Sequence, residues 1–201
     1  MTPRSAQQNA MIKDETREQI LSGALRVFSH RGYAATRVSD IAKACGLSHG
    51  LLYYYFQSKD EIFTELVRRA VESSSNALLM AEAIPAPAFQ KIEWITREVL
   101  SNVMTDADSA YYFLIMTQTS VTDVLPDKIQ AIMKQSSVPF DVMLRIVAEG
   151  QIQDSVVAGD VQQLVTAYWS AIQGIAIYRI AFKDNFQMPD ADILLRMLRA
   201  V

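Results

Sequence analysis

Residues 36–61 read TRVSDIAKACGLSHGLLYYYFQSKDE, and the rest of the chain is organised around this stretch. Apolar residues recur every three or four positions across residues 38–45, which predicts one short helix with a buried face. Gly46 follows as a turn residue, and Ser48 is placed to cap a second short helix. A helix, a glycine turn and a helix in so short a span is the layout of a helix-turn-helix, whose second helix enters the DNA major groove.

The two ends of this stretch predict where its helices begin. Thr36 is the expected N-cap of the first short helix. Ser58 and Glu61 form a capping box, so a longer helix is expected to begin at Lys59. Cys45 lies on the apolar face of the first short helix. It is interpreted as a small buried hydrophobe, with a reactive thiol as the alternative, because no base or second cysteine lies beside it.

The start of the second short helix supplies the side chains expected at base edges. These residues are Ser48, His49, Gly50 and Leu51. The three tyrosines at 53–55 follow at successive steps of about 100°, so they cannot all face one core. At least one must point outward, with its hydroxyl available to a phosphate. Leu52 and Phe56 are the expected inward anchors of this helix.

The same residues resemble the N-terminal signature of the TetR-type transcriptional regulators, over about residues 17–66. The resemblance rests on the following matches: Phe28, Gly32-Tyr33, Thr36-Arg37-Val38, Ile41-Ala42, Ala44-Cys45-Gly46-Leu47-Ser48, Gly50, Leu52-Tyr53-Tyr54-Tyr55-Phe56 and Ser58-Lys59-Asp60. It implies an all-α homodimer, with three N-terminal helices for DNA and a divergent C-terminal helical domain for an effector and for dimer contacts. The family usually represses, and its effector releases the protein from a palindromic operator.

Carried onto matching positions, the resemblance gives each residue of the helix-turn-helix an expected role. Thr36, Arg37 and Ser39 would lie near the DNA backbone or groove. His49, Gly50 and Leu51 would face base edges, with the apolar Leu51 suited to a thymine methyl group. The phosphate contacts would come from Tyr53, Tyr55 and Lys59, and Ser48 and Tyr54 complete the DNA-binding set.

The remaining helical patterns predict three parts of the chain: a flexible tail over 1–13, a DNA-binding domain over 14–60, and an effector-binding and dimerisation domain over 61–201. The tail is either merely solvated or brings Arg4 and Lys13 to a polyanion. About nine helices are expected. The later ones span Lys59 to Ile84, Ala88 to Met104, the aromatic run within 108–122, one helix from Pro126 kinked at Pro139, Asp160 to Lys183, and Pro189 to Arg199.

The C-terminal part also contains candidate effector and dimer residues. A mostly apolar pocket could be lined by Trp94, Tyr111, Tyr112, Phe113, Met116, Tyr168, Trp169 and Gln173. Aromatic stripes of this kind are also typical of a plain core, and that alternative stays open. The helix after Asp160 is apolar nearly all round, which predicts burial against a partner subunit. The dimer candidates are Ala171, Gly174, Ile175, Tyr178, Ile193 and Met197.

Charge and composition narrow the function classes. Residues 1–60 carry eight basic and five acidic side chains, whereas residues 61–201 carry eleven and seventeen, so the basic end is the expected DNA-docking face. One cysteine and an N-terminus without an apolar run indicate a cytoplasmic protein. No membrane span, cofactor or metal is expected. An enzyme is the weaker rival, because both histidines lie in the DNA module. The other alternative is a helical ligand carrier or scaffold that lacks specific DNA binding.

Overall fold

The computed structural model describes residues 6–122 and 125–200, and only the backbone of residues 6–10. Regular structure in these residues is helical, apart from one isolated bridge between Val156 and Arg199. The predicted all-α fold is confirmed. In chain order the helices are α1 (Ala6–Ala35), α2 (Val38–Ala44), α3 (His49–Tyr55), α4 (Lys59–Glu82), α5 (Ala88–Thr105), α6 (Ser109–Ser120), α7 (Asp127–Met133), α8 (Val138–Ile152), α9 (Val161–Phe182), a 3₁₀ turn η1 (Lys183–Asn185) and α10 (Ala191–Leu195).

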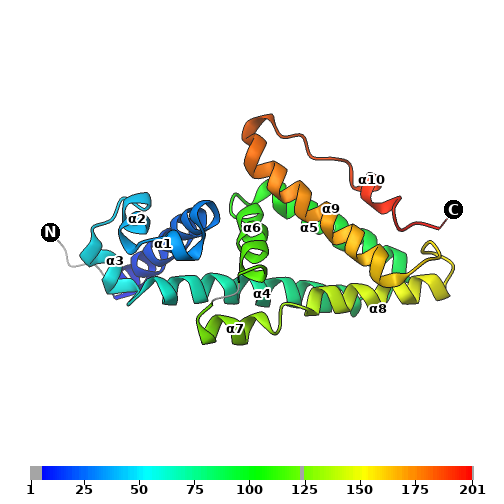
Figure 1. Ribbon diagram of the computed structural model, residues 1–201, viewed down its shortest axis with the longest axis horizontal. Helices are drawn as coiled ribbons and strands as arrows, with labels where there is room; N and C mark the ends of the chain where they lie inside the picture. Colours follow the sequence, from blue (N-terminus) through cyan, green and yellow to red (C-terminus); the bar gives the residue numbers. More distant parts are fainter. Residues whose placement is uncertain (1–5, 123–124, 201) are drawn as a thin grey trace.

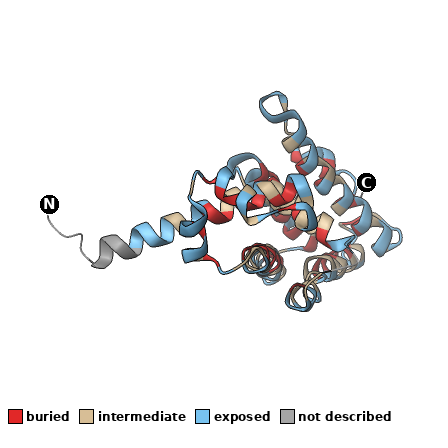
Figure 2. Ribbon diagram, turned by 60° about the vertical axis from the view of Figure 1, so that its left-hand side comes forward, coloured by how far each residue is buried: buried red, intermediate tan, exposed pale blue. Residues whose placement is uncertain are grey.

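Helix α4 is the axis of the molecule. It runs along the long dimension, with α1, α2 and α3 at one end and α5, α8 and α9 at the other, and α6 stands between the two groups (Figure 1). Residues 11–15 of α1 stand clear of the body and are exposed (Figure 2). We call α1–α3 the head.

Two hydrophobic cores lie along α4. The core of the head includes Phe28, Ile41, Leu52 and Phe56, and it continues into the first half of α4 with Ile62, Phe63, Leu66, Val67 and Val71. Ile115 of α6 and Ile129 of α7 also belong to it. The second core takes Leu78 and Ala81 from the far half of α4, together with side chains of α5, α8, α9 and α10. Because α4 lies in both cores, each end is packed against the same rigid rod.

Three predicted helix starts are confirmed by hydrogen bonds. Ser48 Oγ accepts from the backbone N–H of Leu51 at 3.2 Å. Ser58 Oγ accepts from Glu61 N–H at 3.2 Å, while the Glu61 carboxylate accepts from Gln57 N–H at 2.7 Å. The Asp160 carboxylate caps α9 in the same way. Since each cap satisfies an N–H that the helix leaves unpaired, these side chains fix where α3, α4 and α9 begin.

Two predictions for the N-terminal part were wrong. Thr36 does not cap α2, because its hydroxyl donates to Gly32 O at 2.7 Å and its side chain is buried. Arg37 occupies the N-cap position, and its N–H is satisfied by the Asp40 carboxylate at 3.0 Å. The second error concerns the start of the first helix, which was expected at Asp14 and lies at Ala6, while the flexibility expected of residues 1–13 stays a prediction. Arg4 lies outside the described residues.

Two further predictions failed in the C-terminal part. The helix expected to kink at Pro139 is two separate helices, and Pro139 lies in the first turn of α8, where its missing N–H would have had no helical partner. The last helix is also much shorter than the range predicted. α10 ends at Leu195, and the chain beyond it pairs with Val156.

Candidate nucleic-acid interface

Helix α3 presents the residues predicted to read bases. Its anchors Leu52 and Phe56 are fully buried in the core of the head. Ser48, His49 and Gly50 are exposed, and Leu51 keeps 41% of its surface. The local sequence explains this division, because the anchors at 52 and 56 are four residues apart and therefore share one face of the helix.

The three tyrosines differ in exposure, as the helical geometry requires. Tyr54 is the most exposed, at 67%, Tyr53 follows at 41%, and Tyr55 is half-buried. The His49 and Tyr53 rings meet edge to face at 4.9 Å between centroids. Lys13 lies 5.7 Å from the Tyr54 ring. The exposed face of α3 therefore combines donors, acceptors and one apolar side chain, which is the chemistry needed for base edges and phosphates.

The start of α2 contributes two of its three predicted contact residues to the surface. Arg37 and Ser39 are exposed, whereas Thr36 is 1% exposed, so its side chain faces the protein and not a DNA groove. Cys45 at the end of α2 is buried against the Gln19 and Ile20 carbonyls, and burial raises the pKa of its thiol. Its interpretation as a small core side chain is confirmed.

The predicted phosphate contact at Lys59 has a different geometry from the other candidates. Its ammonium donates to the carbonyls of Tyr33 and Thr36 at 3.0 Å each and to that of Ala34 at 3.4 Å. All three acceptors lie where α1 ends. The sequence places Lys59 at a helix start, but nothing in the local pattern signals partners more than twenty residues away.

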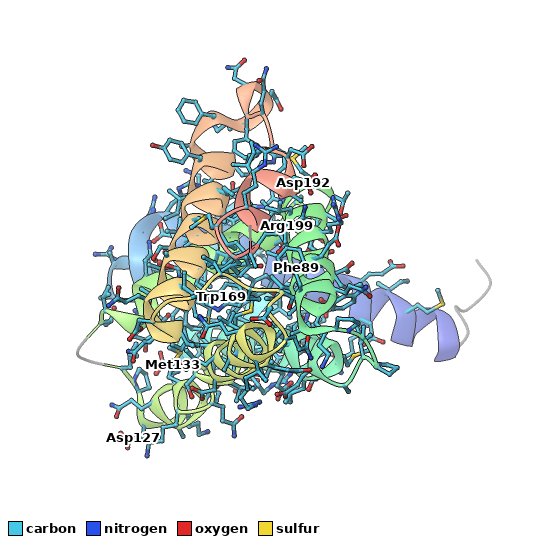
Figure 3. All side chains as sticks on the ribbon, turned by 90° about the vertical axis from the view of Figure 1, so that its right-hand side faces the viewer. Phe89, Asp127, Met133, Trp169, Asp192 and Arg199 are labelled. Carbon is cyan, nitrogen blue, oxygen red and sulfur yellow. The ribbon has the colours of Figure 1, made fainter. Side chains whose placement is uncertain are left out.

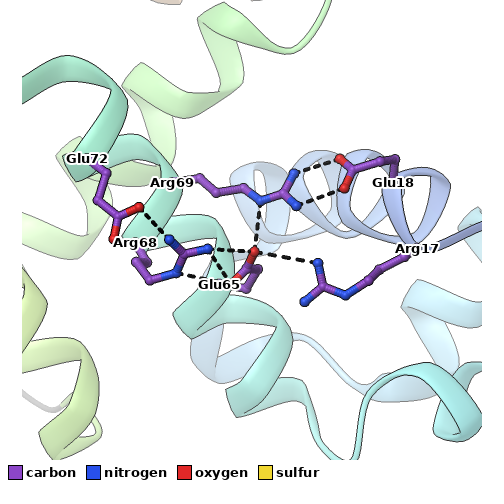
Figure 4. A network of polar contacts seen from close by, with 6 residues as sticks. All are labelled: Arg17, Glu18, Glu65, Arg68, Arg69 and Glu72. Atoms are coloured by element: carbon purple, nitrogen blue, oxygen red, sulfur yellow. Dashed lines mark hydrogen bonds and ion pairs between the residues drawn. The ribbon is translucent and has the colours of Figure 1, made fainter. Parts of the chain in front are cut away.

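An ionic network between α1 and α4 joins the head to α4 (Figure 4). Glu65 is its centre, with Arg69 Nε at 2.9 Å, Arg68 Nη2 at 2.9 Å and Arg17 Nη1 at 3.5 Å. Arg69 also pairs with Glu18 at 2.6 Å. Burial alone would raise the pKa of Glu65, but the three guanidinium groups outweigh it and the pKa is lowered. The network was missed in the sequence, because its α1 and α4 members lie far apart in the chain.

Helix α6 forms a second connection to α1. Ser29, which is buried, donates to Tyr111 O at 3.2 Å, and Gln118 Nε2 donates to Ser29 O at 2.8 Å. Arg26 pairs with Asp108 at 3.2 Å. These bonds place the aromatic run of α6 partly against the head.

The structure does not gather the eight predicted effector residues around one space. Tyr111, Tyr112 and Met116 pack on the core of the head, while Phe113, Tyr168 and Trp169 belong with the second core. Trp94 is 40% exposed and Gln173 is exposed.

Two of these aromatic residues differ in a way that matters for binding. Tyr168 is fully buried, and its hydroxyl is 3.0 Å from Thr96 Oγ1, so it is a satisfied core side chain. Trp169 is the next residue on α9 (Figure 3), and its indole Nε1 is buried without a hydrogen-bond partner among the described residues. A buried donor without a partner is uncommon and is a natural anchor for a polar atom of a ligand.

The structure also has two grooves whose lining includes none of the eight predicted effector residues. One, of about 430 Å³, lies between α1 and the end of α2, beside Gln19, Arg26, His30 and Cys45. The other, of about 420 Å³, lies where α9 ends, and it is lined by Ile175, Tyr178, Phe182, Asn185, Phe186, Gln187 and Pro189.

The predicted dimer residues fall into two groups. On α9, Ala171, Gly174 and Ile175 are half-buried and Tyr178 is 58% exposed, with its ring stacked on Phe182 at 5.4 Å. On α10, Ile193 is 58% and Met197, just past its end, 40% exposed, while Leu194, Leu195 and Leu198 are buried beneath them. Because α10 spans only Ala191–Leu195, it offers a partner much less surface than α9, which spans Val161–Phe182.

Comparison with known proteins supports the helix-turn-helix assignment. Residues 20–66 match the bacterial regulatory proteins of the tetR family. Residues 20–66 form a tetR-family domain. It is 32% identical over 93 residues to the HTH-type transcriptional regulator AcrR of Shigella flexneri, an alignment that covers 46% of this chain and 43% of AcrR. It is 29% identical over 163 residues to the HTH-type transcriptional repressor Rv1474c of Mycobacterium tuberculosis, covering 74% and 86%. The chain thus spans less than half the length of AcrR.

Solved structures share the whole fold at lower identity. The MbdR regulator of Azoarcus sp. CIB superposes with a TM-score of 0.75 and 22% identity, over 92% of this chain and 98% of that one. AibR, solved with isovaleryl coenzyme A and operator DNA, gives a TM-score of 0.70 and 18% identity, again over 92% and 98%. The curated relatives named here are transcriptional regulators or repressors. No helix within residues 6–122 or 125–200 is both long and apolar enough to cross a membrane.

Proposed function

We propose that this protein is a homodimeric transcriptional repressor that binds a palindromic operator and is released by a small apolar or aromatic effector. The observation that carries the proposal is α3, which is anchored by buried Leu52 and Phe56 and exposes His49, Leu51 and Tyr53. This arrangement is what a recognition helix needs, because a rigid anchor fixes side chains that must reach base edges.

Operator binding is tested with the DNA upstream of the protein's own gene. The double variant His49→Ala, Tyr53→Ala should lose specific binding and keep its fold, since both side chains are exposed. The matched control is Met80→Ala with Gln90→Ala, two exposed positions at the far end of α4 and on α5. Binding of the wild type should weaken steeply with salt. Equal binding by both double variants, or no salt-sensitive preference for this DNA, would contradict the regulator and favour the scaffold alternative.

The proposed dimer forms through the exposed face of α9. Ile177, Tyr178 and Phe182 are 41%, 58% and 51% exposed, and a Cβ added at Gly174 would have no neighbouring atom within 4 Å among the described residues. A large apolar surface with a small residue in it favours close approach of a second copy. One recognition helix makes few base contacts, so a dimer also explains how two half-sites would be read.

Sedimentation measures this association. Ile177→Asp should convert the dimer to a monomer, because it places a charge in an apolar contact. Ile152→Asp is the matched control, since Ile152 is 86% exposed on α8. If both variants stay dimeric, α9 is not the interface.

The effector class rests on the side chains of the aromatic run. The helix SAYYFLIMTQTS of α6 has no charged residue, and the buried Nε1 of Trp169 offers one donor. Similar folds have been solved with choline, with isovaleryl coenzyme A and with triclosan, so the fold by itself does not select a ligand. Side chains without charge, with the unsatisfied indole donor near them in the fold, favour an apolar or aromatic compound that carries an acceptor.

A further inference from the structure

Lys59 has no N–H left for a phosphate. A lysine ammonium has three N–H donors, and here three carbonyl oxygens accept them, those of Tyr33, Ala34 and Thr36, at 3.0, 3.4 and 3.0 Å. A phosphate could bind Lys59 only by displacing one of these carbonyls.

The three carbonyls lie where the α1 helix is broken. Gly32 has φ 75° and ψ 163°, outside the helical region, so the last residues of α1 do not continue a regular ladder. Carbonyls at a helix end have no intrahelical donor and carry partial negative charge. Lys59 therefore supplies from α4 the C-terminal cap that α1 lacks. Thr36 satisfies Gly32 O in the same junction.

Tyr33 closes the same junction from the other side. Its ring lies 4.6 Å from the Lys59 ammonium, and its hydroxyl donates to Asp60 Oδ1 at 2.7 Å. The far side of the region is filled by Phe63, whose ring centroid is 4.8 Å from that of Tyr33. Burial, followed by the bond to Asp60, raises the pKa of Tyr33 to about 12, so its hydroxyl remains a donor at neutral pH. The first two residues of α4 are thus both tied to the end of α1.

We infer that Lys59 and Tyr33 form a clamp between α4 and the junction of α1 with α2, and that Lys59 is a positioning residue and not a phosphate contact. The inference rests on the proposed operator binding. The clamp sets the angle of the α2–α3 pair relative to α4, and hence the distance between the two recognition helices of a dimer. Phosphate contacts then fall to exposed groups of the head such as Arg37, Lys43 and Tyr53.

Three variants separate the two roles of a lysine. Lys59→Met keeps the stem and removes the donors, and Lys59→Arg keeps donors. Lys43→Met removes an exposed cation of the same head. Operator affinity is measured against salt, and on operators whose half-sites are moved one base pair closer or further apart.

The clamp predicts that Lys59→Met weakens binding by about tenfold or more at every salt concentration, with the wild-type salt slope. Its preference for the native half-site spacing should fall, and Lys59→Arg should recover part of that preference. Loss of fold stability alone would lower affinity for all spacings equally. Lys43→Met should instead reduce the salt slope by about 0.9, as loss of one phosphate contact does. A reduced slope for Lys59→Met with unchanged spacing preference would overturn the clamp.

Amide hydrogen exchange of the free protein tests, without DNA, whether Lys59 holds the junction of α1 with α2. Lys59→Met should speed exchange over residues 33–40, and unchanged exchange there would overturn the inference. If the wild type fails to bind operator DNA while exchange responds as expected, the proposed function fails and the clamp stands. Where Lys59→Met does not fold, Tyr33→Phe is used, because it keeps the ring and removes only the bond to Asp60. It should speed exchange over the same residues by a smaller factor.

Discussion

The head at one end of α4 and the helices at its other end differ in what determines which of their side chains are exposed. At the head, apolar anchors such as Leu52 are fully buried and their neighbours in sequence, such as Leu51, are exposed. At the far end, Tyr168 is conspicuous in the sequence but is buried core, while Trp94 lies at the surface. A short motif with fixed cap, turn and anchor positions determines which side chains face out. A long helix that is apolar on most faces does not, because several rotations about its axis bury it equally well.

The largest expected effect separates the neighbours Leu51 and Leu52. Leu52→Ala should lower the free energy of unfolding by about 2–5 kcal/mol, because it leaves a cavity in the core of the head. Leu51→Ala should change stability by less than about 0.5 kcal/mol, as exposed substitutions usually do. Denaturant unfolding gives both values.

The same two variants test whether the exposed face of α3 contacts DNA bases. If Leu51 contacts a thymine methyl group, Leu51→Ala should weaken operator binding by about 1–3 kcal/mol although the protein is as stable as the wild type. Equal loss of stability in both variants would show that the exposed and buried faces of α3 have been assigned incorrectly.

The fold was predicted from sequence wherever a short-range signal determines geometry. Ser48, Ser58 and Asp160 cap helices because a side-chain oxygen reaches an N–H only three residues away. Pro139 was misplaced since the apolar register continues across the break, and a proline fits a first turn as well as a kink.

The candidate site was predictable to the same extent. The exposed face of α3 follows from its anchors, but the partners of Lys59 lie 23 to 26 residues away and depend on how α1 ends against α4. The eight effector candidates share only composition. Which of them line a space depends on the packing of α5, α6 and α9, and no local pattern encodes it.

The ionic network is a second polar connection between the head and α4, beside the contacts of Lys59 and Asp60. Glu65→Gln should cost about 1–2 kcal/mol, since it leaves the Arg17, Arg68 and Arg69 donors without their charged acceptor. Thermal unfolding at neutral pH measures the loss. Glu82→Gln is the control, as Glu82 pairs with Arg145 in a more exposed bridge at the far end of α4.

The difference in stability between the wild type and Glu65→Gln should depend on pH in a definite direction. The folded pKa of Glu65 lies below its ordinary value of 4.5, so its stabilisation is fully present above that value and is lost as the pH falls through the folded pKa. The gap in unfolding temperature between wild type and Glu65→Gln should therefore be constant near pH 7 and close below about pH 4. A gap that widens on acidification would mean that Glu65 is not held ionised by its arginines.

The smallest effect separates neighbours on α9. Tyr168→Phe removes one buried bond while Thr96 keeps its bond to Ile92 O at 2.7 Å, so the cost should be about 1 kcal/mol. Because the Tyr168 hydroxyl is already satisfied inside the core, effector-induced release from the operator should be unchanged. Trp169→Phe removes a donor that has no partner in the described part of the chain, so its principal effect should be on release. If Tyr168→Phe shifts the effector concentration for half-maximal release and Trp169→Phe does not, the ligand contact is the tyrosine and not the indole. The ligand would then bind within side chains that are buried core in the structure.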